Sequence, residues 1–95
     1  MTKDELFKIH CDFTRTAFDT MQRKNADYAH EGDPFRNFRT FGTFGVLVRM
    51  SDKLARLRTF EERGVFSVKD ESLRDTLEDL INYAIIYYAM TKEGS

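Results

Sequence analysis

The stretch that decides the fold is ESLRDTLEDLINYAIIYYAM, residues 71 to 90. Its apolar side chains recur at steps of three and four residues, which places them along one face of an α-helix. The members of this stripe are Leu73, Leu77, Leu80, Ile81, Ala84 and Tyr88. The whole chain holds only five glycines and one proline, so few positions interrupt helices. The pattern predicts a long helix from about Asp70 to Lys92.

Two further long helices are predicted before it. The first begins at a capping box formed by Thr2 and Glu5 and runs to about Lys24. The second covers roughly residues 44 to 63, and Gly64 is placed to end it. Their apolar stripes are Leu6, Ile9, Phe13, Ala17 and Met21 in the first helix, and Val46, Met50, Leu54 and Leu57 in the second.

The segment DPFRNFRTFGTF, residues 33 to 44, carries four phenylalanines at a strict spacing of three. Asp33 and Pro34 suit the start of a short helix, and on a 3₁₀ turn side chains three apart nearly align. We expect at least two of the rings, those of Phe35 and Phe38, to pack over the bundle as a lid. Three polar side chains would then project from this lid: Arg36, Asn37 and Arg39.

These elements define an all-α protein, a small helical bundle of three long helices plus a short helix or irregular lid segment. The 95 residues suit a single domain, residues 1–95. Three helices of this length take up most of the chain, which leaves few residues to cover their apolar faces. We therefore expect homo-oligomerisation to complete the bundle.

Composition narrows the class of protein. Fifteen basic and 16 acidic residues give a net charge of −1, which argues against binding of duplex DNA. The chain has one cysteine, no apolar run near the ~20 residues of a membrane span, and a charged start unlike a signal peptide. These features predict a soluble, cytoplasmic protein without a membrane partner.

Polar residues on the third helix raise the question of a metal. Asp75, Asp79 and Asn82 step by four and three residues, so they share a face. The ordinary interpretation is a solvated polar face. The same line continues to Ile86 and Met90, however, which favours a face covered by protein, where carboxylates need Arg, Lys or a divalent cation. Oxygen-rich clusters of this kind suit magnesium or manganese.

The second helix carries the sequence RMSDKLAR, with three cations around Asp52. The simplest interpretation is a ladder of salt bridges within the helix. The functional alternative is that Asp52 joins the third-helix acids at a metal while the cations bind phosphate. The cations are Arg49, Lys53 and Arg56.

Three blocks carry a family resemblance: KNADYAHEGDPFRNFR, GVLVRMSDKLARL and DESLRDTLEDLINYAI. Together they span residues 24 to 85 and resemble the nucleotide modification associated domain family, short proteins often found in phages and prophages. The resemblance implies an association with nucleotides and does not fix a reaction.

A more distant similarity is to MazG-like, all-α nucleotide pyrophosphohydrolases, which hold magnesium between acidic pairs on two helices. Glu71, Asp75, Glu78 and Asp79 resemble the pair on the later helix. The earlier helix departs from the pattern, because Asp52 is its single acid in this stretch and stands among cations.

Three hypotheses follow. The first is a phage-type protein that binds a (deoxy)nucleotide with magnesium, with or without hydrolysis of a phosphoanhydride. The second is an oligomeric binder that sequesters a linear or cyclic nucleotide signal of host antiphage immunity without metal chemistry. The third is a structural or protein-binding helical module whose charges form solvated faces. The predicted nucleotide-binding residues are Lys24, Asp27, Tyr28, Arg36, Phe38, Arg39, Arg49, Lys53 and Arg56, and the predicted metal ligands are Asp52, Glu71, Asp75 and Asp79.

Overall fold

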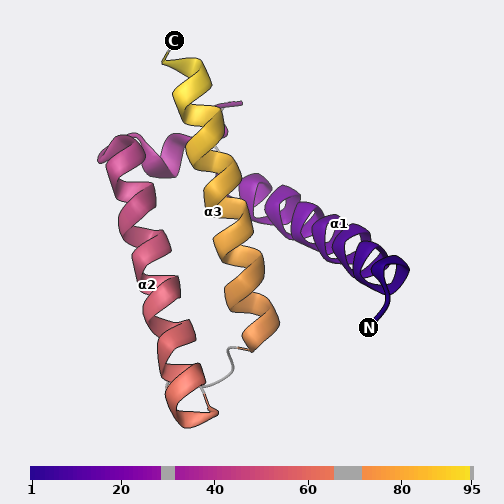
Figure 1. Ribbon diagram of the computed structural model, residues 1–95. Coiled ribbons are helices and arrows are strands. Elements are labelled where there is room, and N and C mark those ends of the chain that lie inside the picture. The colour runs from indigo at the N-terminus through magenta and orange to yellow at the C-terminus, as the bar shows by residue number, and fades with distance from the viewer. Residues whose placement is uncertain (29–31, 66–71, 95) are drawn as a thin grey trace.

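The computed structural model describes residues 1–28, 32–65 and 72–94, without the side chains of Asp27 and Tyr28. Three helices account for most of these residues: α1 (Lys3–Tyr28), α2 (Gly42–Arg63) and α3 (Leu73–Glu93). A short 3₁₀ helix, η1 (Arg36–Phe38), precedes α2 (Figure 1). The prediction of an all-α protein with three long helices is confirmed over the described residues.

The three helices form an open arrangement. α2 and α3 lie side by side and run in opposite directions, and α1 packs across α3 and then leaves the pair toward the N-terminus (Figure 1). The Cα radius of gyration is 14.9 Å, whereas a compact chain of this length has a value of about 12 Å. Within the part of the chain that the structure describes, no helix is long and apolar enough to cross a membrane.

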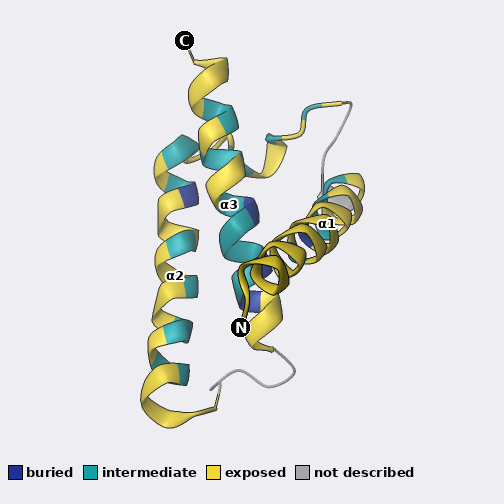
Figure 2. Cartoon of the chain, turned by 45° about the vertical axis from the view of Figure 1, so that its right-hand side comes forward, coloured by how far each residue is buried: buried dark blue, intermediate teal, exposed yellow. Residues whose placement is uncertain are grey.

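The core is thin and partly polar. Among the described residues, the buried apolar side chains are Ala17 and Val46, while Thr76, Glu78 and Asn82 are buried polar ones (Figure 2). The predicted stripe of α1 is covered only in its second half. Leu6 and Ile9, in the first half, are exposed.

The helix ends follow local capping chemistry. The Glu5 N–H donates to the Thr2 hydroxyl at 3.1 Å, as predicted. Gly64 ends α2 with a φ of 75°, a conformation that glycine adopts without steric cost. The sequence predicts the start of α3 at about Asp70, which lies outside the described residues. The helix begins at Leu73, because Ser72 and Asp75 form a reciprocal capping box.

The segment between α1 and α2 packs against α3 through one of its phenylalanines. Phe38 meets Tyr83 edge to face at 6.2 Å between ring centroids, and both Phe35 and Phe38 are half-buried, as predicted. Phe41 and Phe44 are exposed. The short helix begins at Arg36 rather than at Pro34, and the Asp33 carboxylate accepts the Phe35 N–H at 3.0 Å.

Candidate functional site

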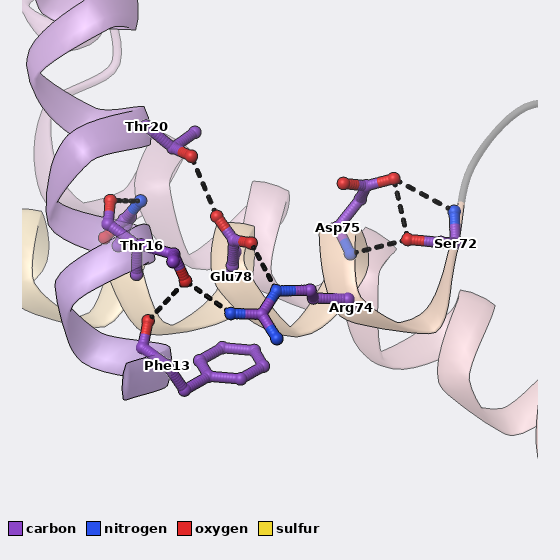
Figure 3. Close-up of polar contacts among 9 residues, drawn as sticks. Phe13, Thr16, Thr20, Ser72, Arg74, Asp75 and Glu78 are labelled. Atoms are coloured by element: carbon purple, nitrogen blue, oxygen red, sulfur yellow. Dashed lines mark hydrogen bonds and ion pairs between the residues drawn. The ribbon is translucent and has the colours of Figure 1, made fainter. Parts of the chain in front are cut away.

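The crossing of α1 over α3 is held by polar side chains (Figure 3). Glu78 accepts hydrogen bonds from the Thr20 hydroxyl at 2.8 Å and from Arg74 Nε at 3.2 Å. The Asn82 amide donates to the Ala17 carbonyl of α1 at 3.0 Å. Because buried polar groups are costly without partners, these bonds fix where α1 crosses. They also place the last turns of α1 beside the middle of α3.

Asp79, the residue after Glu78 on α3, forms ion pairs that connect all three helices. Its Oδ1 lies 2.9 Å from Lys24 Nζ of α1, and its Oδ2 lies 2.8 Å from Lys53 Nζ of α2. The side chains of Asp79 and Lys53 are only 16% and 12% exposed. The sequence predicted that carboxylates on this face need a cation, and for Asp79 two lysines supply it.

The two lysines change the acidity of Asp79. Partial burial alone raises the pKa of this carboxyl, but hydrogen bonds from Lys53 and Lys24 outweigh burial and leave the pKa below its ordinary value. Asp79 is therefore an anion at neutral pH. It holds two ammonium groups from different helices close together.

A cavity of about 380 Å³ opens beside this ion pair. It lies between the last turns of α1, the segment from Pro34 to Phe38, and the facing sides of α2 and α3. The lining residues are Met21, Lys24, Asn25, Pro34, Asn37, Phe38, Arg49, Asp79, Asn82, Tyr83 and Ile86. The charged groups of the lining are two cations and one anion, and Lys53 adds a third cation in contact with Asp79.

Arg49 and Phe38 form one wall of this cavity. The Arg49 guanidinium lies over the Phe38 ring, 5.5 Å from its centroid, at a distance typical of a cation–π contact. The same two residues, together with Asn37, also line a second cavity of about 470 Å³. Its other lining residues are Phe41, Phe44, Gly45, Val48 and Asp52.

The structure brings together five of the predicted site residues and places others elsewhere. Those gathered at the first cavity or its ion pair are Lys24, Phe38, Arg49, Lys53 and Asp79. Arg36 and Arg56 lie outside the lining of both cavities. The side chains of Asp27 and Tyr28 lie outside the described part of the chain.

Arg39 is committed to a different contact. Its guanidinium pairs with Asp33 at 2.8 Å and with Glu93 at the end of α3, and it lies 5.3 Å from the centroid of the Phe35 ring. The hydrogen bonds from Glu93 and Asp33 raise the pKa of Arg39 further above its already high value. Arg39 therefore ties the η1 segment to the last turn of α3.

The predicted metal ligands do not gather within the described residues. Asp75 accepts hydrogen bonds from the Ser72 hydroxyl and N–H at 2.8 and 3.1 Å, so its carboxylate serves the helix cap. Asp79 holds two lysines, Asp52 lines the second cavity, and Glu71 lies outside the described residues. In the described ranges, no three His, Cys, Asp or Glu side chains are grouped to hold a metal ion. The magnesium site stays a prediction.

Sequence reasoning missed several lining residues of the first cavity. Asn25 donates from Nδ2 to the Pro34 carbonyl at 3.1 Å. It stands in the block KNADYAHEGDPFRNFR, which carries the family resemblance, and could have been found there. Asn82 shares the polar face of the third helix with Asp75 and Asp79, but its position alone does not indicate a role at the cavity, and the same holds for Tyr83. Met21 and Ile86 carry no sequence signal that separates them from ordinary core residues.

Comparison with known proteins assigns the family. The model of the nucleotide modification associated domain 1 family matches residues 24–90, well over half of the 95-residue chain, and the chain belongs to this family. Comparison with curated proteins and with solved structures gave no match. The similarity to MazG-like pyrophosphohydrolases stays a prediction.

Proposed function

We propose that the protein binds a nucleotide, with its phosphates in the first cavity. The observation that carries the proposal is that Lys24 and Arg49, from two helices, line one cavity beside an aromatic wall, while Lys53 pairs with Asp79 of the same lining. The volume of about 380 Å³ lies within the range of small-molecule sites. Phosphate groups are recognised by such convergent Arg and Lys side chains.

The local charge supports an anionic ligand although the chain as a whole is nearly neutral. Lys24, Lys53 and Arg49 contribute three positive charges and Asp79 one negative charge, a formal balance of +2. Asp79 orients the two ammonium groups, and an ammonium can donate to a phosphate oxygen while it holds a carboxylate. A phosphate chain would add anionic partners to this cluster.

The family match gives independent support for a nucleotide. Every lining residue of the first cavity except Met21 lies within the matched residues 24–90. The first half of α1, which lies outside the match, contributes nothing to the lining. The region shared with the family thus includes α2, most of α3 and the last residues of α1, and with them most of the cavity lining.

The carboxylates of the described residues favour binding over metal-assisted hydrolysis. Asp79 and Asp75 are engaged by lysines and by the helix cap, so neither is placed as part of an acidic cluster. The proposal therefore assigns phosphate recognition to side-chain cations. Magnesium enters only as a variable of the test.

The experiment is a thermal-shift panel of nucleoside mono-, di- and triphosphates, cyclic nucleotides and nucleosides, each with and without magnesium. Mass spectrometry of the same samples detects any product. We expect stabilisation that grows with the number of phosphates and needs no magnesium, with the nucleotide recovered unchanged. New products that form only with magnesium would support the hydrolase hypothesis instead.

A matched pair of variants keeps this test specific. Lys24→Gln removes a cation of the cavity, and Arg58→Gln removes an exposed cation of α2 that lines neither cavity. We expect the nucleotide-induced shift to fall in the first variant and to stay at the wild-type value in the second. Equal shifts in both variants, or no shift in the wild type, would overturn the proposal.

We also infer that a second copy of the chain covers its exposed apolar surface. The accessible surface is 7281 Å², whereas a compact monomer of 11.2 kDa exposes about 5,700 Å². The excess of about 1,600 Å² is more than the ~800 Å² that each partner buries in an ordinary stable interface. Large apolar side chains on α1 contribute to it: Leu6, Phe7, Ile9 and Phe18.

Sedimentation equilibrium tests this inference. The wild type is expected to sediment as an oligomer, and the double variant Leu6→Glu with Ile9→Glu as a smaller species. Val65→Glu, which changes an exposed apolar residue just after α2, is the control. A wild type that stays monomeric at about 100 μM, well above the Kd range of stable complexes, would contradict the inference.

A further inference from the structure

We propose that the second cavity holds the nucleobase of the bound nucleotide and that Asp52 selects guanine. This inference rests on the proposed function. The cavity of about 470 Å³ shares Asn37, Phe38 and Arg49 with the lining of the first cavity. The proposal divides one ligand between two cavities, with its phosphates among the cations and its base among the phenylalanines.

The lining residues that the two cavities share support a single ligand. Asn37, Phe38 and Arg49 line both, so a molecule that occupies the first cavity meets the wall of the second. Arg49 is placed to contact the ligand from either side. The guanidinium lies over the Phe38 ring, and this contact holds the wall in place. The N–H groups of a guanidinium lie in its own plane, where they can donate to a ligand.

The second cavity has the walls of a stacking site. Phe41 and Phe44 are 78% and 72% exposed, and they stand at the start of α2 around Gly45. Stacking of a base on such a ring is worth about 1–3 kcal/mol. A planar base would cover rings that otherwise face water.

Gly45 is needed for the position of Phe41. A Cβ atom added at Gly45 would lie 2.8 Å from the Cβ of Phe41, which is closer than real Cβ contacts. Glycine at this position therefore lets Phe41 sit over the first turn of α2. Any larger residue would displace this wall of the cavity.

Asp52 gives the cavity a preference among bases. An ionised carboxylate only accepts hydrogen bonds, and its two oxygens match the two adjacent donors of guanine, N1–H and the 2-amino group. Uracil presents one N–H between two carbonyl oxygens, which the carboxylate would repel. Inosine lacks the 2-amino group and so isolates the contribution of that single donor.

The test measures equilibrium affinities of GTP, ITP, UTP and inorganic triphosphate for the wild type and four variants. We expect the wild type to bind GTP about 10-fold more tightly than ITP, the value of one charge-assisted hydrogen bond. Asp52→Asn should abolish this discrimination, and the exposed Asp19→Asn, on α1, should keep it. Phe44→Ala and Gly45→Ala should weaken GTP while inorganic triphosphate binds as before.

The outcomes separate the two proposals. Binding of GTP, ITP and UTP with equal affinity, or GTP affinity unchanged in Phe44→Ala, would overturn the base site and leave phosphate binding intact. A Phe44→Ala variant that changes only the oligomeric state would assign the phenylalanines to an interface between copies. Absence of binding by every probe, inorganic triphosphate included, would overturn the proposed function and the base site together.

Discussion

Glu78 and Asp79 are neighbours on α3, yet they serve two different regions of the molecule. Glu78 faces the crossing with α1, where a hydroxyl and an arginine hold it. Asp79 faces α2 and the end of α1, where two lysines from separate helices hold it beside a cavity. Successive residues on a helix point about 100° apart, so adjacent carboxylates reach different partners.

The difference separates a structural carboxylate from one at a candidate binding site. The partners of Glu78, Thr20 and Arg74, lie at one helix crossing. Arg74 also donates to the Thr16 hydroxyl there. The partners of Asp79 concentrate positive charge at a cavity wall. We therefore expect changes near Glu78 to alter stability first, and changes near Asp79 to alter ligand affinity first.

The largest expected effect is on nucleotide affinity in Arg49→Glu. The substitution places a negative charge at the shared wall of the two cavities. It should weaken the binding of nucleoside triphosphates by at least ~100-fold, because charge-assisted hydrogen bonds are lost. Isothermal titration calorimetry measures it. Arg58→Glu, an exposed change of equal charge on the same helix, is the control. Comparable losses in both variants would point to a nonspecific charge effect.

Glu78→Ala should lower the free energy of unfolding by about 2 kcal/mol, because Thr20 and Arg74 lose a partner at a buried position. Urea denaturation measures the change. Glu61→Ala, on the exposed side of α2, should stay within about 0.5 kcal/mol of the wild type. A wild-type midpoint for Glu78→Ala would show that the crossing does not depend on this network.

Acid should weaken the fold through Asp79. Its pKa in the folded chain lies below the ordinary value of 3.8, so its ion pairs stabilise the protein above that pH. This contribution is lost as the pH falls through the lowered pKa, when the carboxylate takes up a proton. Urea midpoints measured between about pH 5 and about pH 2.5 should fall less steeply in Asp79→Asn than in the wild type. Parallel slopes would contradict the assignment.

The smallest expected effect is at the start of α3. Ser72→Ala removes the hydroxyl that accepts the Asp75 N–H at 3.0 Å and should cost about 1 kcal/mol. The same change frees the Asp75 carboxylate from the cap hydroxyl. Because Asp75 belongs to no group of three His, Cys, Asp or Glu side chains among the described residues, Ser72→Ala should not create a magnesium-dependent stabilisation. A magnesium-dependent rise in melting temperature in this variant alone would revive Asp75 as a metal ligand.

The helices were predictable from the sequence because their signals are local. The spacing of apolar residues on α3, the Thr2 cap and Gly64 each act within a few residues. The start of α3 at Leu73 depends on the Ser72–Asp75 capping box, which the spacing of apolar residues alone does not reveal. The same Asp75 then looked like a metal ligand, although the cap accounts for its carboxylate.

The site was only partly predictable because it depends on where the helices cross. The sequence identified Lys24, Lys53 and Asp79 as candidates, but it could not tell that the two lysines converge on one carboxylate. Arg39 was equally basic and equally close to phenylalanines, yet it pairs with Glu93, 54 residues away in the chain. Long-range partners of this kind are not encoded in periodicity or spacing.

The most direct test of the account compares Lys24→Gln with Glu78→Gln in two measurements, the urea midpoint and the affinity for GTP. We expect opposite patterns: Lys24→Gln loses affinity by about 10-fold or more with a smaller change of midpoint than Glu78→Gln, because Lys24 is half-exposed, and Glu78→Gln loses stability with near wild-type affinity when folded. Two results would contradict this expectation. Either each variant loses stability and affinity in the same proportion, or Lys24→Gln binds GTP as tightly as the wild type does.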